Sequence, residues 1–130
     1  MEIVQLPDGL GGTVKTIRFH GINVQIVNGS GSTTGLVDGL GNLIVGYNEL
    51  RRAGDDRSGS HNIVVGKEHN FNSFGGLVAG FSNTLSGSHA SVSGGQQNTA
   101  SGYRASVSGG NTRSALNTDD WVAGALFEDN

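Results

Sequence analysis

The histidines are the side chains of this 130-residue chain best suited to bind a metal ion or to move a proton. They occur at His20, His61, His69 and His89, and none has a partner at a metal-ligand spacing such as His-Glu-x-x-His. Three copies of one histidine could meet on a symmetry axis and hold an ion. However, His61 and His89 occupy matching places in a repeat, which descent from one repeat unit explains more simply. We therefore predict no metal site and no cofactor.

Adjacent aspartates are the other candidates for acid–base chemistry, and they occur as Asp55-Asp56 and Asp119-Asp120. Neighbouring side chains on a strand point to opposite faces, so neither pair forms a ready dyad. The glycine-rich segment 9–12 lacks the Lys-Ser/Thr that completes a phosphate-binding loop, and no serine has the setting of a nucleophile elbow. We expect no catalytic residue and predict that the protein is not an enzyme.

The composition differs from that of an ordinary globular protein, so we expect different elements to position these side chains. The chain has 23 glycines, one proline and no cysteine, and only 35% of its residues are hydrophobic. The formal net charge of −3 gives no reason to expect nucleic acid as a partner. No apolar run approaches the roughly 18 residues needed for membrane insertion.

A repeat of about 14 residues organises the middle of the chain, which argues against disorder. Each copy is a short strand-like segment followed by glycine, and the central residues lie 20, 14, 14 and 15 positions apart. We predict that these central residues form the core: Ile44, Val64, Val78, Val92 and Val107.

A repeat of this length suits two short strands joined by two tight turns, which predicts an all-β parallel β-roll or β-helix. Alternation places Ala90 with Val92, and Ala105 with Val107, on one inner face. The outer face changes from Ile63, Val65 and Leu77 in early copies to serines in later ones. A coil cannot bury both faces of one strand, so we predict these three apolar residues as contacts of a homotrimer.

Residues 87–95 (GSHASVSGG) and 98–102 (NTASG) resemble the head repeats of YadA-like trimeric autotransporter adhesins, with their haemagglutinin-type β-roll. Residues 41–49 and 59–66 are similar to the opening of the repeat array in related bacterial proteins of unknown function. The likeness covers about residues 39 to 115. It implies a left-handed, trimeric, parallel β-roll at the cell surface or in the extracellular space.

The spacing of 20 between the first two copies indicates an insertion within residues 50–57, the most charged segment of the chain. Two interpretations stay open. The segment is either a solvated turn whose charges pair with one another, or a recognition loop. The candidate recognition residues are Arg51, Arg52, Asp55, Asp56 and Arg57.

The two ends differ from the repeats at 41–115. In residues 1–40 we predict half-buried strands over 14–27, as first coils or a lid, followed by a Gly/Ser/Thr-rich loop. Residues 116–130 are expected to cap the open end of the stack or to contact the next subunit of a fibre. The residues named for this role are Trp121, Leu126 and Phe127.

Three functional hypotheses follow. The first is a non-catalytic surface protein, a trimeric head or spacer that presents loops to a glycan or protein receptor. The second is a subunit of an extracellular fibre that assembles through its ends. The third, and least favoured, is a carbohydrate-active β-helix enzyme.

Overall fold

The computed structural model describes residues 1–125, and in that part of the chain every regular element is a β-strand. The all-β prediction is therefore confirmed. Two strands, β1 (Glu2–Pro7) and β2 (Thr13–Arg18), form a separate antiparallel hairpin. All other strands belong to two parallel sheets.

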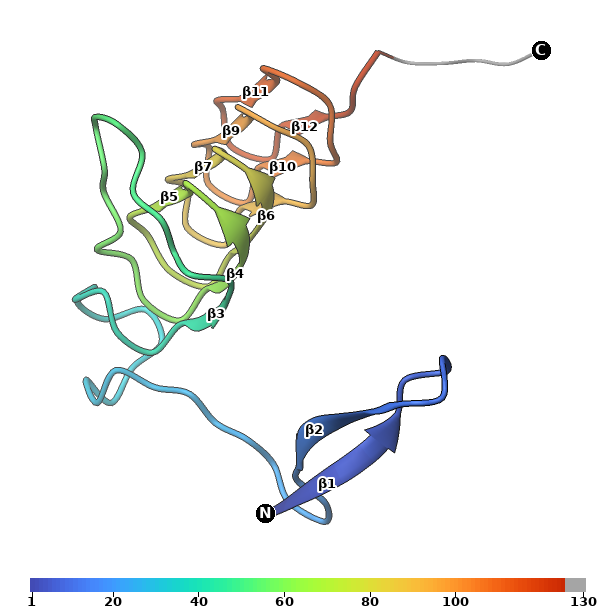
Figure 1. The fold of residues 1–130 in the computed structure, drawn as a ribbon. Helices are drawn as coiled ribbons and strands as arrows, with labels where there is room; N and C mark the ends of the chain where they lie inside the picture. Colours follow the sequence, from blue (N-terminus) through green and yellow to red (C-terminus); the bar gives the residue numbers. More distant parts are fainter. Residues whose placement is uncertain (126–130) are drawn as a thin grey trace.

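The two parallel sheets form a β-solenoid (Figure 1). The six-stranded sheet has the order β12-β10-β8-β6-β4-β3, and the four-stranded sheet has the order β11-β9-β7-β5. From β4 onward the chain alternates between the sheets, so each pair of strands makes one coil. The strands of the six-stranded sheet are β3 (Leu43–Val45), β4 (Ile63–Lys67), β6 (Leu77–Phe81), β8 (Ser91–Val92), β10 (Ser106–Val107) and β12 (Trp121–Val122). Those of the four-stranded sheet are β5 (Asn70–Phe71), β7 (Thr84–Leu85), β9 (Thr99–Ala100) and β11 (Ser114–Ala115).

The register stacks one apolar side chain above another along the inside of each sheet. In the six-stranded sheet Val64 pairs with Val78, Val78 with Val92, and Val92 with Val107. All four are buried, as are Ala90 and Ala105, so the predicted inner face is the core. Ile44 continues the column opposite Val64 but is 38% exposed, because β3 is the last strand at that edge.

The four-stranded sheet fills the other half of the core with side chains that become smaller along the chain. Phe71 and Leu85 are in register and buried, and the residues that follow them in the stack are Ala100 and Ala115. The opposite sheet contributes one valine per coil throughout. Because protein interiors are densely packed, the coils that contain alanine must be narrower than those that contain Phe71 or Leu85.

The corners of the coils use left-handed backbone at residues other than glycine. One corner repeats this at His61, His89, Arg104 and Asp119, and the other at Glu68, Ser82, Gln97 and Thr112, all with φ between 54° and 64°. Glycine is required where coils stack most closely. A Cβ on Gly66, Gly80 or Gly95 would clash with the backbone carbonyl of the next coil.

Buried amide side chains hold successive corners together. Asn83 Oδ1 accepts the backbone N–H of Asn98 at 2.8 Å, and Asn98 Oδ1 accepts that of Arg113 at 2.8 Å. The Nδ2 group of Asn98 donates to the carbonyls of Gly94 and Gly110 at 3.1 and 3.0 Å. Each asparagine therefore satisfies backbone groups in its own coil and in the next one, which buried polar atoms require.

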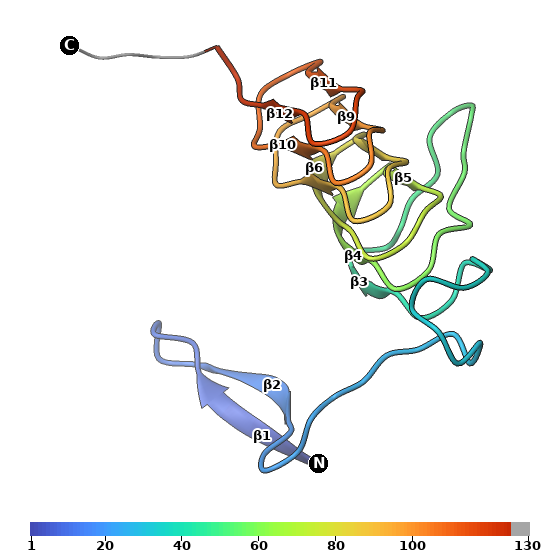
Figure 2. The same ribbon diagram turned by 180° about the vertical axis from the view of Figure 1, so that it is seen from behind.

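The N-terminal residues differ from the expectation of first coils. Residues 13–18 form β2, but its partner is the antiparallel strand β1, and no strand forms over 19–27. The side chains of Ile22, Val24 and Ile26 are exposed there, because no neighbouring strand of this chain pairs with that segment. Figures 1 and 2 show the hairpin standing apart from the solenoid, joined to it by this extended linker.

At the opposite end, Trp121 and Val122 form β12 and pair with Ser106 and Val107. These two residues therefore extend the stack by one strand. The other residues predicted for this end, Leu126 and Phe127, lie outside the described residues.

Candidate interaction surfaces

The outer face of β3, β4 and β6 is apolar, and it contains all three residues predicted as trimer contacts. Ile63 is 46% exposed there, whereas Val65 and Leu77 are half-buried. In-register neighbours extend the surface into two parallel columns. We call this surface the apolar face; its residues are Leu43, Val45, Ile63, Val65, Leu77 and Ala79.

The same sheet becomes hydroxylic beyond β6. Ser91 follows Leu77 in register, and its hydroxyl lies 3.0 Å from that of Ser106. The last strand ends this half of the sheet with Trp121, whose indole N–H donates to the Ser108 hydroxyl at 2.8 Å. One sheet therefore presents an apolar half and a polar half to its surroundings, and only the apolar half lacks a favourable interaction with water.

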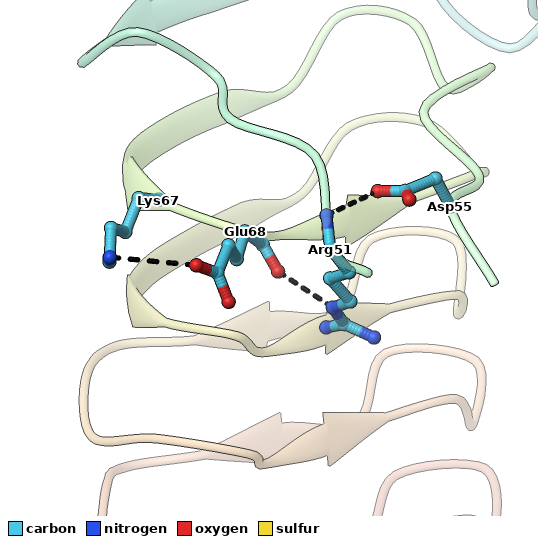
Figure 3. Close-up of polar contacts among 4 residues, drawn as sticks. All are labelled: Arg51, Asp55, Lys67 and Glu68. Carbon is cyan, nitrogen blue, oxygen red and sulfur yellow. Dashed lines mark hydrogen bonds and ion pairs between the residues drawn. The ribbon is translucent and has the colours of Figure 1, made fainter. Parts of the chain in front are cut away.

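The charged insertion folds back along the solenoid as a strap, defined as residues 46–58 (Figures 1 and 3). Arg51 fastens it: Nε donates to the carbonyl of Glu68 at 2.7 Å, and Nη2 donates to the carbonyl of Asn83 at 2.6 Å. Nη2 also lies 3.1 Å from the Thr84 hydroxyl. The guanidinium thus ties the strap to two successive coils.

The other charged residues of the insertion, except Arg52, make hydrogen bonds within the strap itself. Asp55 accepts the backbone N–H of Arg51 at 2.8 Å, and Asp56 accepts the Ser58 hydroxyl at 2.7 Å. Arg57 Nη1 donates to the Asn48 carbonyl. Arg52, in contrast, has an exposed side chain. The geometry therefore gives four of the five candidate recognition residues a structural contact, mostly with backbone groups and neighbouring polar side chains, and leaves Arg52 outward.

A ridge of rings follows one corner of the coils. The His89 ring packs edge-on against Phe74 and Tyr103, with centroid distances of 5.3 and 5.9 Å. The Arg104 guanidinium lies 4.6 Å from the Tyr103 ring centroid and binds Asp119 through two hydrogen bonds of 2.6 and 2.7 Å. This ion pair holds the pKa of the exposed Asp119 carboxyl below its usual value. Sequence reasoning missed the ridge, because the rings become neighbours only through the coil stacking.

Two histidines act as acceptors of backbone N–H groups. His69 is buried; its Nδ1 accepts the N–H of Asn83 at 3.1 Å, so Nε2 donates to the Val65 carbonyl at 2.9 Å. Burial lowers the pKa of His69, although its hydrogen bonds to backbone groups oppose that effect. His61 Nε2 accepts the N–H of Asn28 at 3.2 Å and joins the linker to the first complete coil.

Carboxylates and histidines do not converge in the part of the chain that the structure describes. Across residues 1–125, no group of three or more His, Cys, Asp or Glu side chains is placed to hold a metal ion. Asp119 pairs with Arg104, whereas Asp120 accepts the backbone N–H of Asn117 at 2.8 Å. The same 125 residues contain no helix long and apolar enough to cross a membrane.

Compared with protein-family models, curated protein sequences and solved structures, the chain matches none of them. Its function is therefore argued from the surfaces described above.

Proposed function

We propose that the protein is a non-catalytic structural and adhesive module, a homotrimer of left-handed β-rolls with a repeat of about 14 residues. The apolar face is the observation that carries this proposal. Its two columns lie on the outside of a sheet whose inner side is already packed, and Leu43, Val45 and Ile63 remain about half exposed, so another molecule can cover them. A copy of the same chain is the simplest partner, since it offers an identical apolar surface.

We propose three copies because the head repeats that residues 87–95 and 98–102 resemble are trimeric. A rotation axis parallel to the stack brings equivalent columns together from each copy and closes the assembly. The outward sides of such a trimer are the strap and the ring ridge, each present three times. These are the surfaces that we propose for contact with a glycan or protein receptor outside the cell, in keeping with the resemblance to adhesin heads.

Substitution within the apolar face tests the proposal. In Ile63→Thr with Leu77→Thr, both new residues keep a high strand propensity but lose apolar area, so we expect the trimer to dissociate. The matched control is Ser91→Thr with Ser106→Thr on the hydroxylic half of the same sheet, which should leave the trimer intact. Light scattering measures the mass of each, and equal masses for the two double variants would contradict the proposed interface.

Assembly through the ends is the second candidate. Trp121 is 66% exposed on β12, and Leu43 and Val45 are exposed on β3 at the opposite edge of the same sheet. An edge strand with free backbone groups is a template for pairing with another chain. If the ends join, the parent protein forms polymers whose length grows with concentration, and Trp121→Glu shortens them. A parent of constant mass would exclude this mode.

A carbohydrate-active enzyme is the least favoured reading, because glycoside hydrolysis needs two carboxyl groups facing one groove. Asp56 and Asp120 are instead used as turn acceptors. Glycan hydrolysis by the purified protein that is lost in Asp56→Asn or Asp120→Asn would overturn the non-enzyme proposal. A glycan-binding screen on the intact protein addresses the receptor itself.

A further inference from the structure

The N-terminal hairpin exposes apolar side chains on both of its faces. Directly paired residues share a face, so Ile3 with Ile17 lies on one side of the ribbon and Leu6 with Val14 on the other. Ile3 is 72% exposed, Ile17 56% and Val14 51%. A two-stranded hairpin alone is at best marginally stable in water. The hairpin therefore needs a surface to cover it.

The linker continues this apolar character to the solenoid. Phe19, Ile22 and Val24 are exposed along it. Its last part reaches the apolar face, where Val24 and Ile26 line a shallow hollow together with Leu43 and Ile63. Exposed apolar side chains thus recur along the chain from the hairpin to the apolar face. We call residues 2–27, the hairpin with its linker, the arm.

The solenoid of the same chain contacts only the end of the arm. A Cβ on Gly41 would clash with Val27 and Asn28, so the end of the arm lies directly against the solenoid there. The hydrogen bond from Asn28 N–H to His61 Nε2 fixes that position. From this point the arm leaves the stack, and Figures 1 and 2 both show the hairpin beyond β3, on the side of the six-stranded sheet.

We propose that the arm packs against a second copy of the chain, reaching from its own solenoid across to the neighbouring arm and apolar face. This inference rests on the self-association in the proposed function and adds a second contact to it. A second copy is the occupant because the arm and the apolar face are continuous. The rotation that brings apolar faces together therefore also brings the arms together, and one interface buries both.

Variants of the hairpin test this role in the full-length protein. Ile3→Thr with Ile17→Thr preserves strand propensity and removes apolar area from one face of the hairpin. We expect the concentration at which the oligomer dissociates to rise about tenfold or more. The control is Leu10→Ser, at a turn position that is 93% exposed and outside the paired strands, which should leave that concentration unchanged. Circular dichroism verifies that each variant keeps its strands.

Proteolysis of the unmodified protein gives an independent measurement. The trypsin sites Lys15 and Arg18 lie in the hairpin, and Arg52 lies in the exposed strap. We expect cleavage at Lys15 and Arg18 to be slow in the oligomer and to accelerate upon dilution, while cleavage at Arg52 keeps its rate. An oligomer cut equally fast at all three sites, with unchanged dissociation in the double variant, overturns the arm inference but leaves the apolar-face interface standing. A monomeric parent overturns both.

Discussion

At the scale of single residues, side chains at one corner of the solenoid accept hydrogen bonds from backbone N–H groups of the next coil. Asn83 and Asn98 each accept the N–H of the following coil through Oδ1. His69 occupies the preceding place in this ladder. Its Nδ1 accepts the N–H of Asn83, as Oδ1 of an asparagine does in the later coils. Its Nε2 donates to the carbonyl of Val65, just as Nδ2 of Asn83 donates to the carbonyl of Ala79. An imidazole thus replaces an amide, with the difference that it can be protonated.

Protonation of His69 should destabilise the fold. Burial lowers its folded-state pKa below the ordinary value of 6.5, so below that value protons bind preferentially to the unfolded chain. The stability that the neutral ring contributes is full above about pH 6.5 and is lost as the pH falls toward the folded pKa. We expect His69→Asn, which restores the amide of the ladder, to reduce the loss of melting temperature between about pH 7.5 and pH 5.

The control for that measurement is His20→Asn, because the side chain of His20 is 74% exposed. It should keep the pH dependence of the parent. If His69→Asn shows the same loss of melting temperature as the parent, the ladder role of the neutral ring is wrong.

Removing one amide from the ladder should be costly. Asn98→Ala leaves the N–H of Arg113 and two carbonyls without their partner in a buried corner. An unsatisfied buried group costs roughly 1–3 kcal/mol, so we expect the free energy of unfolding to fall by about 3 kcal/mol. Urea denaturation measures this change. Asn111→Ala, at an exposed site on the next coil, is the matched control and should change the free energy little.

At the scale of elements, the strap is an insertion that the solenoid has incorporated. Its position between β3 and β4 is predictable from the sequence, since the spacing of Ile44 and Val64 exceeds that of the later copies. The path of the strap is not predictable from the sequence, because the same charged residues could also form a loop that does not contact the coils. Arg51 determines the path, because its guanidinium donates hydrogen bonds to the carbonyls of Glu68 and Asn83 at the corner of two coils.

Arg51→Ala should release the strap without unfolding the coils. A hydrogen bond from a charged donor contributes roughly 1.5–3 kcal/mol, and the buried Asn83 carbonyl keeps a second donor in the backbone N–H of Asn70. We therefore expect a loss of about 1.5 kcal/mol, together with faster hydrogen exchange in residues 46–58. Arg52→Ala removes the neighbouring charge and should change neither quantity. Equal exchange in both variants would show that Arg51 does not fasten the strap.

The period of the valines predicts the parallel stacking, because Val64, Val78, Val92 and Val107 have one position per coil and one face to bury. The hairpin was harder to predict. Residues 22–26 alternate as a strand does, yet they form none, whereas the strand Glu2–Pro7 has a weaker pattern. Alternation indicates that a face will be buried, but not whether the covering surface belongs to the same chain.

At the scale of the whole molecule, a single chain has exposed apolar side chains on the apolar face and on the arm. Apart from Phe71 and Leu85, the core is filled by valine and alanine side chains, which provide little apolar area for a thin stack. The apolar face and the arm lie outside that core, and residues such as Val45, Ile63 and Ile3 remain exposed there. Association of copies would bury both and would give the solenoid the stability that its own interior provides only in part.

Sedimentation equilibrium of the unmodified protein over a wide concentration range tests the proposed trimer most directly. We expect a species with three times the chain mass of 13.3 kDa at the higher concentrations, in equilibrium with single chains at the lowest ones. In Ile63→Thr with Leu77→Thr, dissociation should begin at higher concentrations than in the parent. A folded parent that sediments with the mass of one chain at every concentration would contradict the proposed trimer.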